Sequence, residues 1–487
     1  MKKYTIPAIL FLLLLNFQCA RAESDLIWDF KEDDFLESLE DDVPPINEEK
    51  KRFLESEISK NLDIDVTYTN LAECVITAAK ESYDLKINSH LLKSSEYEFW
   101  AKTAELLPNF DYNFSIADLN GEFLVGGVVP VKVHEVVIES SFELTWDITN
   151  QGRTIFDMVA IKKAVKSRKY NLDYTLDEVI LNTALNYYDL LGKKLELDVY
   201  RINLKDREEQ LKMVQAKYQT GLSSKFDVYR AEAEEAKARQ EYLALFNSMR
   251  YSQAKLANVI GVDVITTLYP VEQTIRVQHI IDSKYDVEAL FKIALKERDD
   301  LNRKRAEIRE MQIKQKKVYA DFIPAMSLEA AHQQVGTLRT GLRTNDSLTY
   351  RVLVPLGKNL GVNTIMRAKT ELEKVKAEKC KLKKMERQVK EDIINSYYDS
   401  KTQLERIEAS KKEVKAADES LKIALVRMEV GEATFLDVLQ AQKAKTEARQ
   451  AIIQHIVNYN KSQVKNLFNI GLITKTAVLT NYKMPKP

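Results

Sequence analysis

Apolar residues recur along much of the chain with the period of a helix. Leucine returns nearly every seven positions from 176 to 218, with Thr183 and Tyr218 in the same register, and this register returns from 386 to 428, interrupted at Glu386 and Ser400. A strict seven-residue repeat makes helices supercoil around one another. The helix predicted from Gln151 to residue 220 would be about 105 Å long, far longer than the helices of an ordinary globular domain.

The apolar period changes to two in four short segments. Even positions are mainly apolar in 110–116 and 136–148, and the alternation returns in 326–331 and 347–356. A proline that ends the preceding helix, Pro108 or Pro324, stands before each pair of segments. The helices predicted before these prolines run from about residue 70 to 107 and from 287 to 322. Each alternating segment is predicted to be a strand with one apolar and one polar face.

Two interpretations of these strands differ in what covers the apolar face. A soluble sheet would need a further apolar layer, but the flanking helices are already committed to coiled-coil packing. Lipid would cover the face instead if the polar face lined a water-filled lumen. Four strands cannot close a barrel, and open sheet edges are not tolerated in lipid. Several copies of the chain would then contribute, and three copies would supply about twelve strands.

The helical part of the sequence is duplicated. KYQTGLSSKFDVYRAEAEEAKARQ (217–240) and RMEVGEATFLDVLQAQKAKTEARQ (427–450) align without a gap at a constant offset of 210 residues. A repeat of this kind indicates an internal duplication. Seven residues return unchanged, namely Gly221, Asp227, Val228, Ala231, Ala238, Arg239 and Gln240 as Gly431, Asp437, Val438, Ala441, Ala448, Arg449 and Gln450.

Each repeated run is predicted to be the turn of a helical hairpin. Its glycine suits the left-handed residue that closes a helix. Ser224 with Asp227, and Thr434 with Asp437, fit the capping box that opens the next helix. Capping alone would explain both aspartates. Alternatively, aspartates at the narrow tip of a symmetric bundle would form a ring of carboxylates that attracts cations, and one residue can serve both roles.

Composition agrees with long helices and offers no catalytic chemistry. Only 13 Gly and 10 Pro occur in 487 residues, and 30% of the residues are charged. Lys+Arg and Asp+Glu both number 73, so no excess of positive charge would recruit nucleic acid. The five histidines show no metal-binding spacing, and no phosphate loop or nucleophile elbow is present. The sequence predicts no enzyme, cofactor or metal site.

The N-terminus is predicted to be a signal peptide covering residues 1–22. A basic start precedes an apolar run from 6 to 17, and Ala20-Arg21-Ala22 fits the cleavage pattern. Cys19 leaves lipid attachment as an alternative, which Gln18 disfavours. Export would permit disulfides, but the remaining Cys74 and Cys380 are far apart and are predicted to be buried free thiols.

The remaining chain divides into an acidic leader, two repeats and two short connecting parts. The leader is predicted to be mobile because it is strongly acidic. Trp28, Phe30, Phe35 and Leu36 within it are candidates for docking on a partner. The predicted boundaries are 23–69 for the leader, 70–261 for the first repeat, 262–286 for an equatorial linker, 287–471 for the second repeat and 472–487 for the tail.

Beyond about residue 60, the chain resembles the TolC-type outer-membrane efflux channel family. The resemblance rests on the duplicated tips YQTGLSSKFDV and MEVGEATFLDV, on the proline before each strand pair and on the 210-residue duplication. It implies a mostly α fold with a small β part. Long antiparallel coiled-coil hairpins would form a trimeric α-helical barrel in the periplasm. A twelve-stranded β-barrel, with four strands per chain, would continue it in the outer membrane.

The resemblance also implies a function and partners. The chain would be a passive exit duct of a tripartite efflux or type I secretion system. A homotrimer would dock on a periplasmic adaptor (membrane fusion) protein and an inner-membrane pump or ABC transporter. The alternative without a pore is a coiled-coil scaffolding protein of the envelope, which would leave the strands unexplained. The exported substrate and the kind of pump do not follow from the sequence.

The functional residues of the family carry over unevenly. Asp437 matches the first aspartate of the periplasmic constriction, whereas the second position is Gln440, so any ring is expected to be weaker. Asp227 matches an acid that helps to hold the tip closed. Its usual tyrosine and arginine partners fall at Met428 and Ala433, so that latch cannot form. The residues that match the adaptor-docking tip are Gly221, Leu222, Ser223, Gly431, Glu432 and Thr434.

Overall fold

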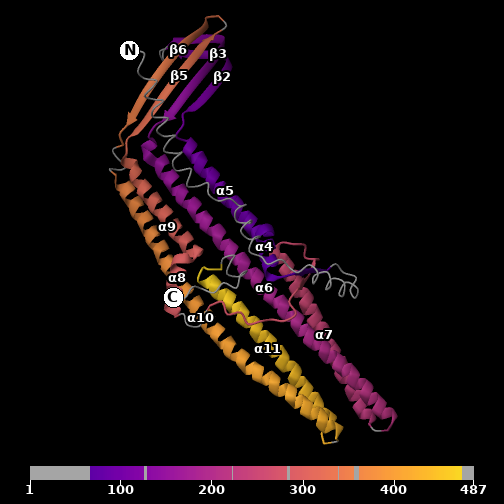
Figure 1. Ribbon diagram of the computed structural model, residues 1–487. Coiled ribbons are helices and arrows are strands. Elements are labelled where there is room, and N and C mark those ends of the chain that lie inside the picture. Colours follow the sequence, from indigo (N-terminus) through magenta and orange to yellow (C-terminus); the bar gives the residue numbers. More distant parts are fainter. Residues whose placement is uncertain are drawn as a thin grey trace.

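The protein is elongated, with a sheet at one end and two helical hairpins at the other (Figure 1). The computed structural model describes residues 66–125, 129–221, 223–281, 286–337, 339–355, 361–430 and 432–473. The predicted signal peptide, nearly all of the acidic leader and most of the predicted tail lie outside the described residues. Among the described helices, none has a stretch both long and apolar enough to cross a bilayer.

Four helices follow each other in each half of the chain. The first half contains α4 (Leu71–Glu81), α5 (Tyr83–Ala104), α6 (Arg153–Gln219) and α7 (Lys225–Ile260), with a 3-10 turn, η1 (Asn150–Gly152), before α6. The second half contains α8 (Val287–Glu297), α9 (Asp299–Lys317), α10 (Val362–Glu429) and α11 (Phe435–Asn469), with η2 (Val318–Phe322) after α9. The predicted antiparallel hairpins are confirmed: α6 packs along α7, and α10 along α11.

The helix before each strand pair is broken, which corrects the prediction of two continuous helices. Ser82 separates α4 from α5 with ψ 124°, and Arg298 separates α8 from α9 with ψ 122°. A glycine that ends the returning helix packs on each break. A Cβ on Gly261 (φ 80°) would lie 2.8 Å from the Glu81 carbonyl oxygen, and one on Gly471 (φ 74°) 2.8 Å from the Arg298 nitrogen. Only glycine combines this close approach with positive φ without strain.

The four predicted strands form one antiparallel sheet, and they are longer than predicted. The strands are β2 (Asn109–Val125), β3 (Val129–Asp147), β5 (Ala325–Thr337) and β6 (Gly341–Leu353), in the order β2-β3-β5-β6. Two further short strands, β1 (Val66–Thr69) and β4 (Thr267–Pro270), pair in parallel near the middle of the molecule.

The strand register places the apolar residues on one face of the sheet, as predicted. One apolar row crosses all four strands as Phe110–Leu144–Ala330–Leu348, and the adjacent row on the other face runs Asp111–Glu143–Ala331–Ser347. The aromatic and aliphatic side chains of this face are exposed in the single chain, including Tyr112, Ile116, Tyr350 and Val352. Toward the far end of β5 and β6 the alternation ends, because His332 and Asp346 form a pair on the same face.

The predicted seven-residue repeat is confirmed only in part in both long helices. In α10 three of its five apolar positions are buried, while Val414 and Met428 are half-buried. Ile393, Ile407 and Leu421 are buried, and the interrupting Ser400 is also buried because its hydroxyl accepts a hydrogen bond from Gln463 Nε2 at 2.6 Å. In α6 the seam is buried from Thr183 to Leu197, but below it the predicted positions Leu204, Leu211 and Tyr218 are partly or fully exposed. Arg207 and Val214 are buried there instead.

The prediction of two buried thiols holds for Cys74 and is wrong for Cys380, which is exposed. Val375 and Val389 of α10 face the rest of the chain and are buried. Cys380 lies on the opposite side of that helix, because residues five and nine positions away point in another direction at 3.6 residues per turn.

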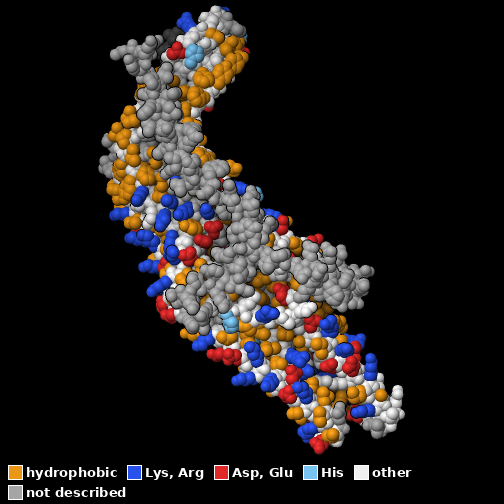
Figure 2. All heavy atoms as spheres, viewed as in Figure 1, with side chains coloured by type: hydrophobic (Ala, Val, Ile, Leu, Met, Phe, Trp, Pro, Cys, Tyr) orange, Lys and Arg blue, Asp and Glu red, His pale blue; other side chains and the backbone are white. Residues whose placement is uncertain are grey.

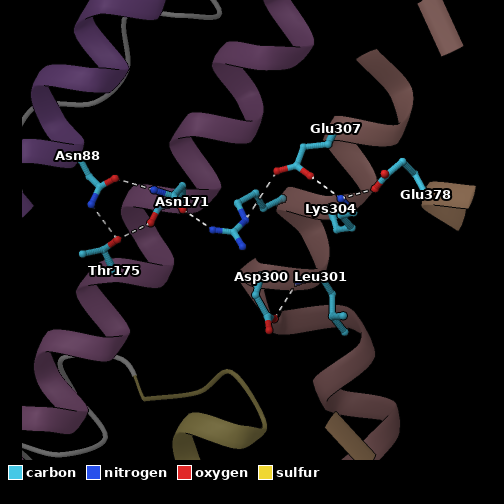
Figure 3. A network of polar contacts seen from close by, with 9 residues as sticks. Asn88, Asn171, Thr175, Asp300, Leu301, Lys304, Glu307 and Glu378 are labelled. Atoms are coloured by element: carbon cyan, nitrogen blue, oxygen red, sulfur yellow. Dashed lines mark hydrogen bonds and ion pairs between the residues drawn. The ribbon is translucent and has the colours of Figure 1, made fainter. Parts of the chain in front are cut away.

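A polar network fastens α5, α6, α9 and α10 side by side near the sheet (Figure 3). Asn171 donates to Asn88 Oδ1 at 2.6 Å and accepts a hydrogen bond from Arg303. Lys304 pairs with Glu307 at 2.9 Å on its own helix and with Glu378 of α10 at 2.7 Å. The network therefore links the two halves of the chain at the level where they form one helical layer.

Candidate docking and constriction site

The two hairpins end in separate tips at the pole opposite the sheet (Figure 1). The first tip joins α6 to α7, and the second joins α10 to α11. Gly221 has φ 76°, which confirms the predicted left-handed end of α6. Leu222 and Gly431, two of the predicted docking residues, lie outside the described residues.

A complete capping box opens α7 at the first tip, as predicted. Asp227 N donates to Ser224 Oγ at 3.2 Å, and Asp227 Oδ2 accepts from Ser224 N at 3.0 Å and Ser224 Oγ at 2.7 Å. A fourth hydrogen bond at this turn comes from the Ser223 hydroxyl, which donates to the same oxygen, Asp227 Oδ2, at 3.2 Å. These donors stabilise the charged carboxylate and lower the pKa of Asp227, with the Ser224 hydroxyl as the largest cause.

The second tip repeats the capping box at α11. Asp437 N donates to Thr434 Oγ1 at 3.3 Å, and Asp437 Oδ2 accepts from Thr434 N at 2.8 Å and Thr434 Oγ1 at 2.7 Å. Ala433 replaces Ser223, so the fourth bond is missing. The Thr434 hydroxyl is the largest cause of the lowered pKa of Asp437. Capping is thus established for both aspartates, and each bears a negative charge at neutral pH.

Within one chain, the structure does not bring the predicted gate residues together. Asp227 and Asp437 belong to different tips, and none of the interactions recorded among the described residues joins them. Met428 is half-buried and packs against Leu421, Val438 and Ala441 of its own hairpin. It is therefore engaged in hairpin packing and not in a latch with Asp227.

Glu432 is an exposed residue of the second tip. Its backbone nitrogen donates to the Arg427 carbonyl at 2.8 Å, while its carboxylate lies 3.9 Å from Arg427 Nε. The backbone of this residue is thus fixed, and its carboxylate, loosely paired with Arg427, stays exposed to a partner. Ser223 at the first tip is half-buried, because its hydroxyl is engaged with Asp227.

Gln440 lines a groove of about 200 Å³ between the two hairpins of the chain. The walls come from α6, α7 and α11, and their residues include Tyr200, Asn203, Arg207, Lys237, Glu241, Leu436 and Thr446. Two hydrogen bonds join the hairpins beside this groove. Tyr200 donates to Gln450 Oε1 at 2.9 Å, and Thr446 donates to Asn203 Oδ1 at 3.5 Å.

Arg207 is a residue of this groove that sequence reasoning missed. It is 5% exposed, and among the described residues no carboxylate lies within ion-pair distance of its guanidinium. Burial lowers the pKa of Arg207, against the opposing effect of Glu234 and Asp206. The available signal was its seven-residue spacing from Tyr200 and Val214, but the leucine heptad pointed to a different face of α6.

The arrangement suits docking and ion attraction more than bond-making chemistry. In the part of the chain that the structure describes, no three His, Cys, Asp or Glu side chains are grouped so as to hold a metal ion. The tips offer fixed carboxylates, an exposed acidic side chain and a groove with charges of both signs. These are features of a surface that binds another helix or screens passing ions.

Comparison with known proteins gives one family and a set of similar folds. The sequence matches the model of the outer membrane efflux protein family over residues 77–262 and 290–465. No curated protein sequence gives a significant match. The Campylobacter jejuni CmeC outer membrane channel is 15% identical with a TM-score of 0.72, and 85% of this chain and 90% of that chain are covered.

Two further solved structures have the same fold. The outer membrane protein VceC of Vibrio cholerae is 16% identical with a TM-score of 0.68, covering 82% of this chain and 96% of that one. The open state of the Neisseria gonorrhoeae MtrE outer membrane channel is 14% identical with a TM-score of 0.66, covering 83% and 89%. At these identities the structures establish the fold, and the family match covers most of the chain.

Proposed function

Because the chain belongs to the outer membrane efflux protein family, we propose that its open sheet and paired hairpins are one third of a continuous exit duct. The protein is an outer membrane exit duct with a periplasmic helical part, and it is a passive channel and not an enzyme. Membership of the family also implies trimeric assembly and interaction with the other components of a tripartite pump.

The observation that carries this proposal is the uncovered sheet. Every residue of β6 is exposed, and β2 and β6 form the two free edges of the sheet. Its apolar face is mostly exposed or half-buried in the described chain, and only Trp146 and Leu328 on it are buried. In a bilayer, free edges would leave backbone groups without hydrogen bonds. Three copies that pair edge to edge would close about twelve strands, with the apolar faces toward lipid and the polar faces toward a lumen.

The helices are proposed to continue this barrel into the periplasm. The polar network at Asn171 and Lys304 holds α5, α6, α9 and α10 in one layer, directly below the sheet. Three such layers, joined edge to edge like the strands, would form a closed helical wall. The α6–α7 and α10–α11 hairpins would extend the wall to the tips.

The tips are proposed to be the periplasmic mouth, where the duct docks on an adaptor protein. Glu432 offers an exposed carboxylate there, and the capping boxes hold Ser223 and Thr434 in fixed positions. In a symmetric trimer, Asp437 would form a ring of three carboxylates beside Gln440. The inner-membrane partner would be a pump or an ABC transporter, with the transported substrate determined by that partner.

The mass of the particle and its contacts in cells test this proposal. Light scattering of the detergent-solubilised chain should give three copies per particle, and a stable monomer would contradict it. A photo-crosslinker at Glu432 should capture a periplasmic adaptor in cells, whereas one at the exposed Lys401, midway along α10 and far from the tip, should not. A pore-free scaffold would be supported by monomers that fractionate away from the outer membrane.

A further inference from the structure

Charge is strongly segregated along this electrically neutral chain. Three segments beside the sheet, 153–171 of α6, 303–317 of α9 and 367–390 of α10, carry 23 Lys and Arg against 7 Asp and Glu. Residues 23–65, which precede the first described residue, carry 16 Asp and Glu against 5 Lys and Arg. Figure 2 shows Lys and Arg side chains gathered over the part of the surface formed by α9 and α10.

One face of α9 and α10 carries cations that form a continuous strip. Lys390 pairs with Glu288 of α8, and Arg305 donates to the Leu295 carbonyl of α8 at 2.7 Å, so α8 packs on this face. Positions four, seven and eleven residues apart share one face of a helix. The cations that share the face with Arg305 and Lys390 by this spacing are Arg309 and Lys316 on α9 and Lys379 and Lys383 on α10, here called the basic strip.

The basic strip has no acidic partner within the described chain. Arg309, Lys316, Lys379 and Lys383 are exposed, and no ion pair is recorded for them among the described residues. Two acids on α10 beside the strip, Glu386 and Glu378, already form ion pairs with other cations. Glu386 pairs with Arg305 at 3.6 Å, and Glu378 pairs with Lys304 and Lys381, both at 2.7 Å. The strip therefore presents an uncompensated positive potential to whatever lies against it.

Apolar residues extend the same face toward the sheet. Leu372 and Ile365 precede Lys379 by seven and fourteen residues, and they are 41% and 45% exposed. The face thus combines cations with two aliphatic side chains. The acidic segment has the complementary composition, because apolar residues stand among its carboxylates, including Trp28, Phe30, Phe35 and Leu36.

The acidic segment joins the described chain at β1, which pairs with β4 beside α6 and α7. This strand begins at Val66, and Val75 just beyond belongs to the same core cluster as Leu301 of α9 and Val389 of α10. The strip starts at this level and runs about 27 Å along α10 to Leu372. A random coil of the length of residues 23–65 would span about 35–40 Å on average, which exceeds the length of the strip.

We propose that residues 23–65, the part of the acidic leader that precedes the described chain, dock on the basic strip and on Leu372 and Ile365, in their own subunit or the adjacent one. Tethering raises the effective concentration of the leader to the millimolar range, so individually weak charge pairs are sufficient. The contact is electrostatic and partly exposed, and it therefore weakens as salt screens the charges. It neutralises a highly cationic section of the helical wall.

Site-specific photo-crosslinking of the full-length trimer tests the proposal. A photo-reactive residue in place of Phe35 is activated at low salt, and the crosslinked peptides are identified by mass spectrometry. Crosslinks are expected in 303–317 and 365–390, and their yield is expected to fall about tenfold at 1 M NaCl, where the Debye length is about 3 Å. The salt titration uses the unaltered strip, so it does not depend on any strip variant folding.

A charge-reversal variant with a matched control completes the test. Arg309→Glu, Lys316→Glu, Lys379→Glu and Lys383→Glu together should abolish the crosslinks while the trimer persists. Reversing four exposed lysines of the lower hairpins, Lys212, Lys411, Lys412 and Lys415, should leave them unchanged. Crosslinks that fall elsewhere, survive strip reversal or go to phosphatidylglycerol in reconstituted vesicles would overturn the proposal. None of these outcomes depends on channel activity.

Discussion

Arg449 of α11 pairs with Asp418 of α10 at 3.1 Å, and 210 residues earlier Arg239 of α7 pairs with Glu208 of α6 at 3.2 Å. The duplicated hairpins thus keep an equivalent ion pair as well as identical residues. The repeated alanines also occupy equivalent positions. All four, namely Ala231, Ala238, Ala441 and Ala448, are buried between the helices of their hairpins. Most of the repeated identities are therefore explained by packing within each hairpin.

The Arg449–Asp418 pair is expected to contribute little to stability. Its side chains are 37% and 28% exposed, and Lys445 also lies 3.3 Å from Asp418. A double-mutant cycle with Arg449→Ala and Asp418→Ala should give a coupling free energy of about 0.2–1 kcal/mol in urea unfolding. A coupling several times larger would show that the hairpin depends on this pair.

The capping and electrostatic roles of the second tip can be separated with two substitutions. Thr434→Ala removes the cap and keeps the carboxylate, so it should cost about 1 kcal/mol of stability and leave ion selectivity unchanged. Asp437→Asn removes the charge and keeps an oxygen that can cap. It should reduce cation preference and block by divalent cations in bilayer recordings. Unchanged selectivity in Asp437→Asn would contradict the electrostatic role and leave Asp437 with capping alone.

Stability should decrease with rising pH because of a carboxyl group between α6 and α9. Burial, together with the charges of Asp299 and Asp173, raises the pKa of Asp177 to about 8. In the unfolded chain this group releases its proton near pH 4. Between about pH 4 and 8 the folded chain therefore holds an extra proton, and the free energy of unfolding falls as pH rises.

Asp177→Asn should remove this pH dependence. Its melting temperature should exceed that of the unchanged protein at pH 8, and the difference should shrink toward pH 4. Asp299, whose pKa burial raises to about 6, acts in the same direction over a narrower range. Asp399→Asn, at an exposed position, is the control and should show no such trend. An equal effect of Asp177→Asn at all pH values would contradict the assignment.

The two described thiols should react very differently. Burial raises the pKa of Cys74 to about 12, while Cys380 is exposed on α10. A maleimide should therefore label Cys380 in the folded protein and reach Cys74 only after denaturation. The Cys380→Ser variant should remain unlabelled until it is unfolded. Rapid labelling of that variant under native conditions would contradict this prediction, because it would show that the maleimide reaches Cys74 in the folded protein.

Local rules in the sequence were sufficient to predict the elements that depend on near neighbours. Ser224 and Asp227 are three residues apart, so their capping box was visible, and the alternation around Phe110 and Leu348 predicted the faces of the sheet. Features set by distant contacts were not visible. Ser82 interrupts a helix where Gly261 packs on it, and Arg207 is buried by helices more than 25 residues away in sequence.

A second group of features that the sequence could not predict depends on other chains. The spacing of Asp437 and Gln440 predicts where a constriction would lie, but one subunit contains only one third of any ring. The exposure of Cys380 likewise depends on which elements cover α10. Periodicity shows that a helix has a buried face, and the packing partner decides which face it is.

Ion conductance of the purified full-length trimer in planar lipid bilayers tests the central claim most directly. If three chains close a barrel around a water-filled lumen, addition of the protein should produce discrete, stepwise currents with a preference for cations. Intact trimers that insert into the bilayer and carry no current would contradict the account.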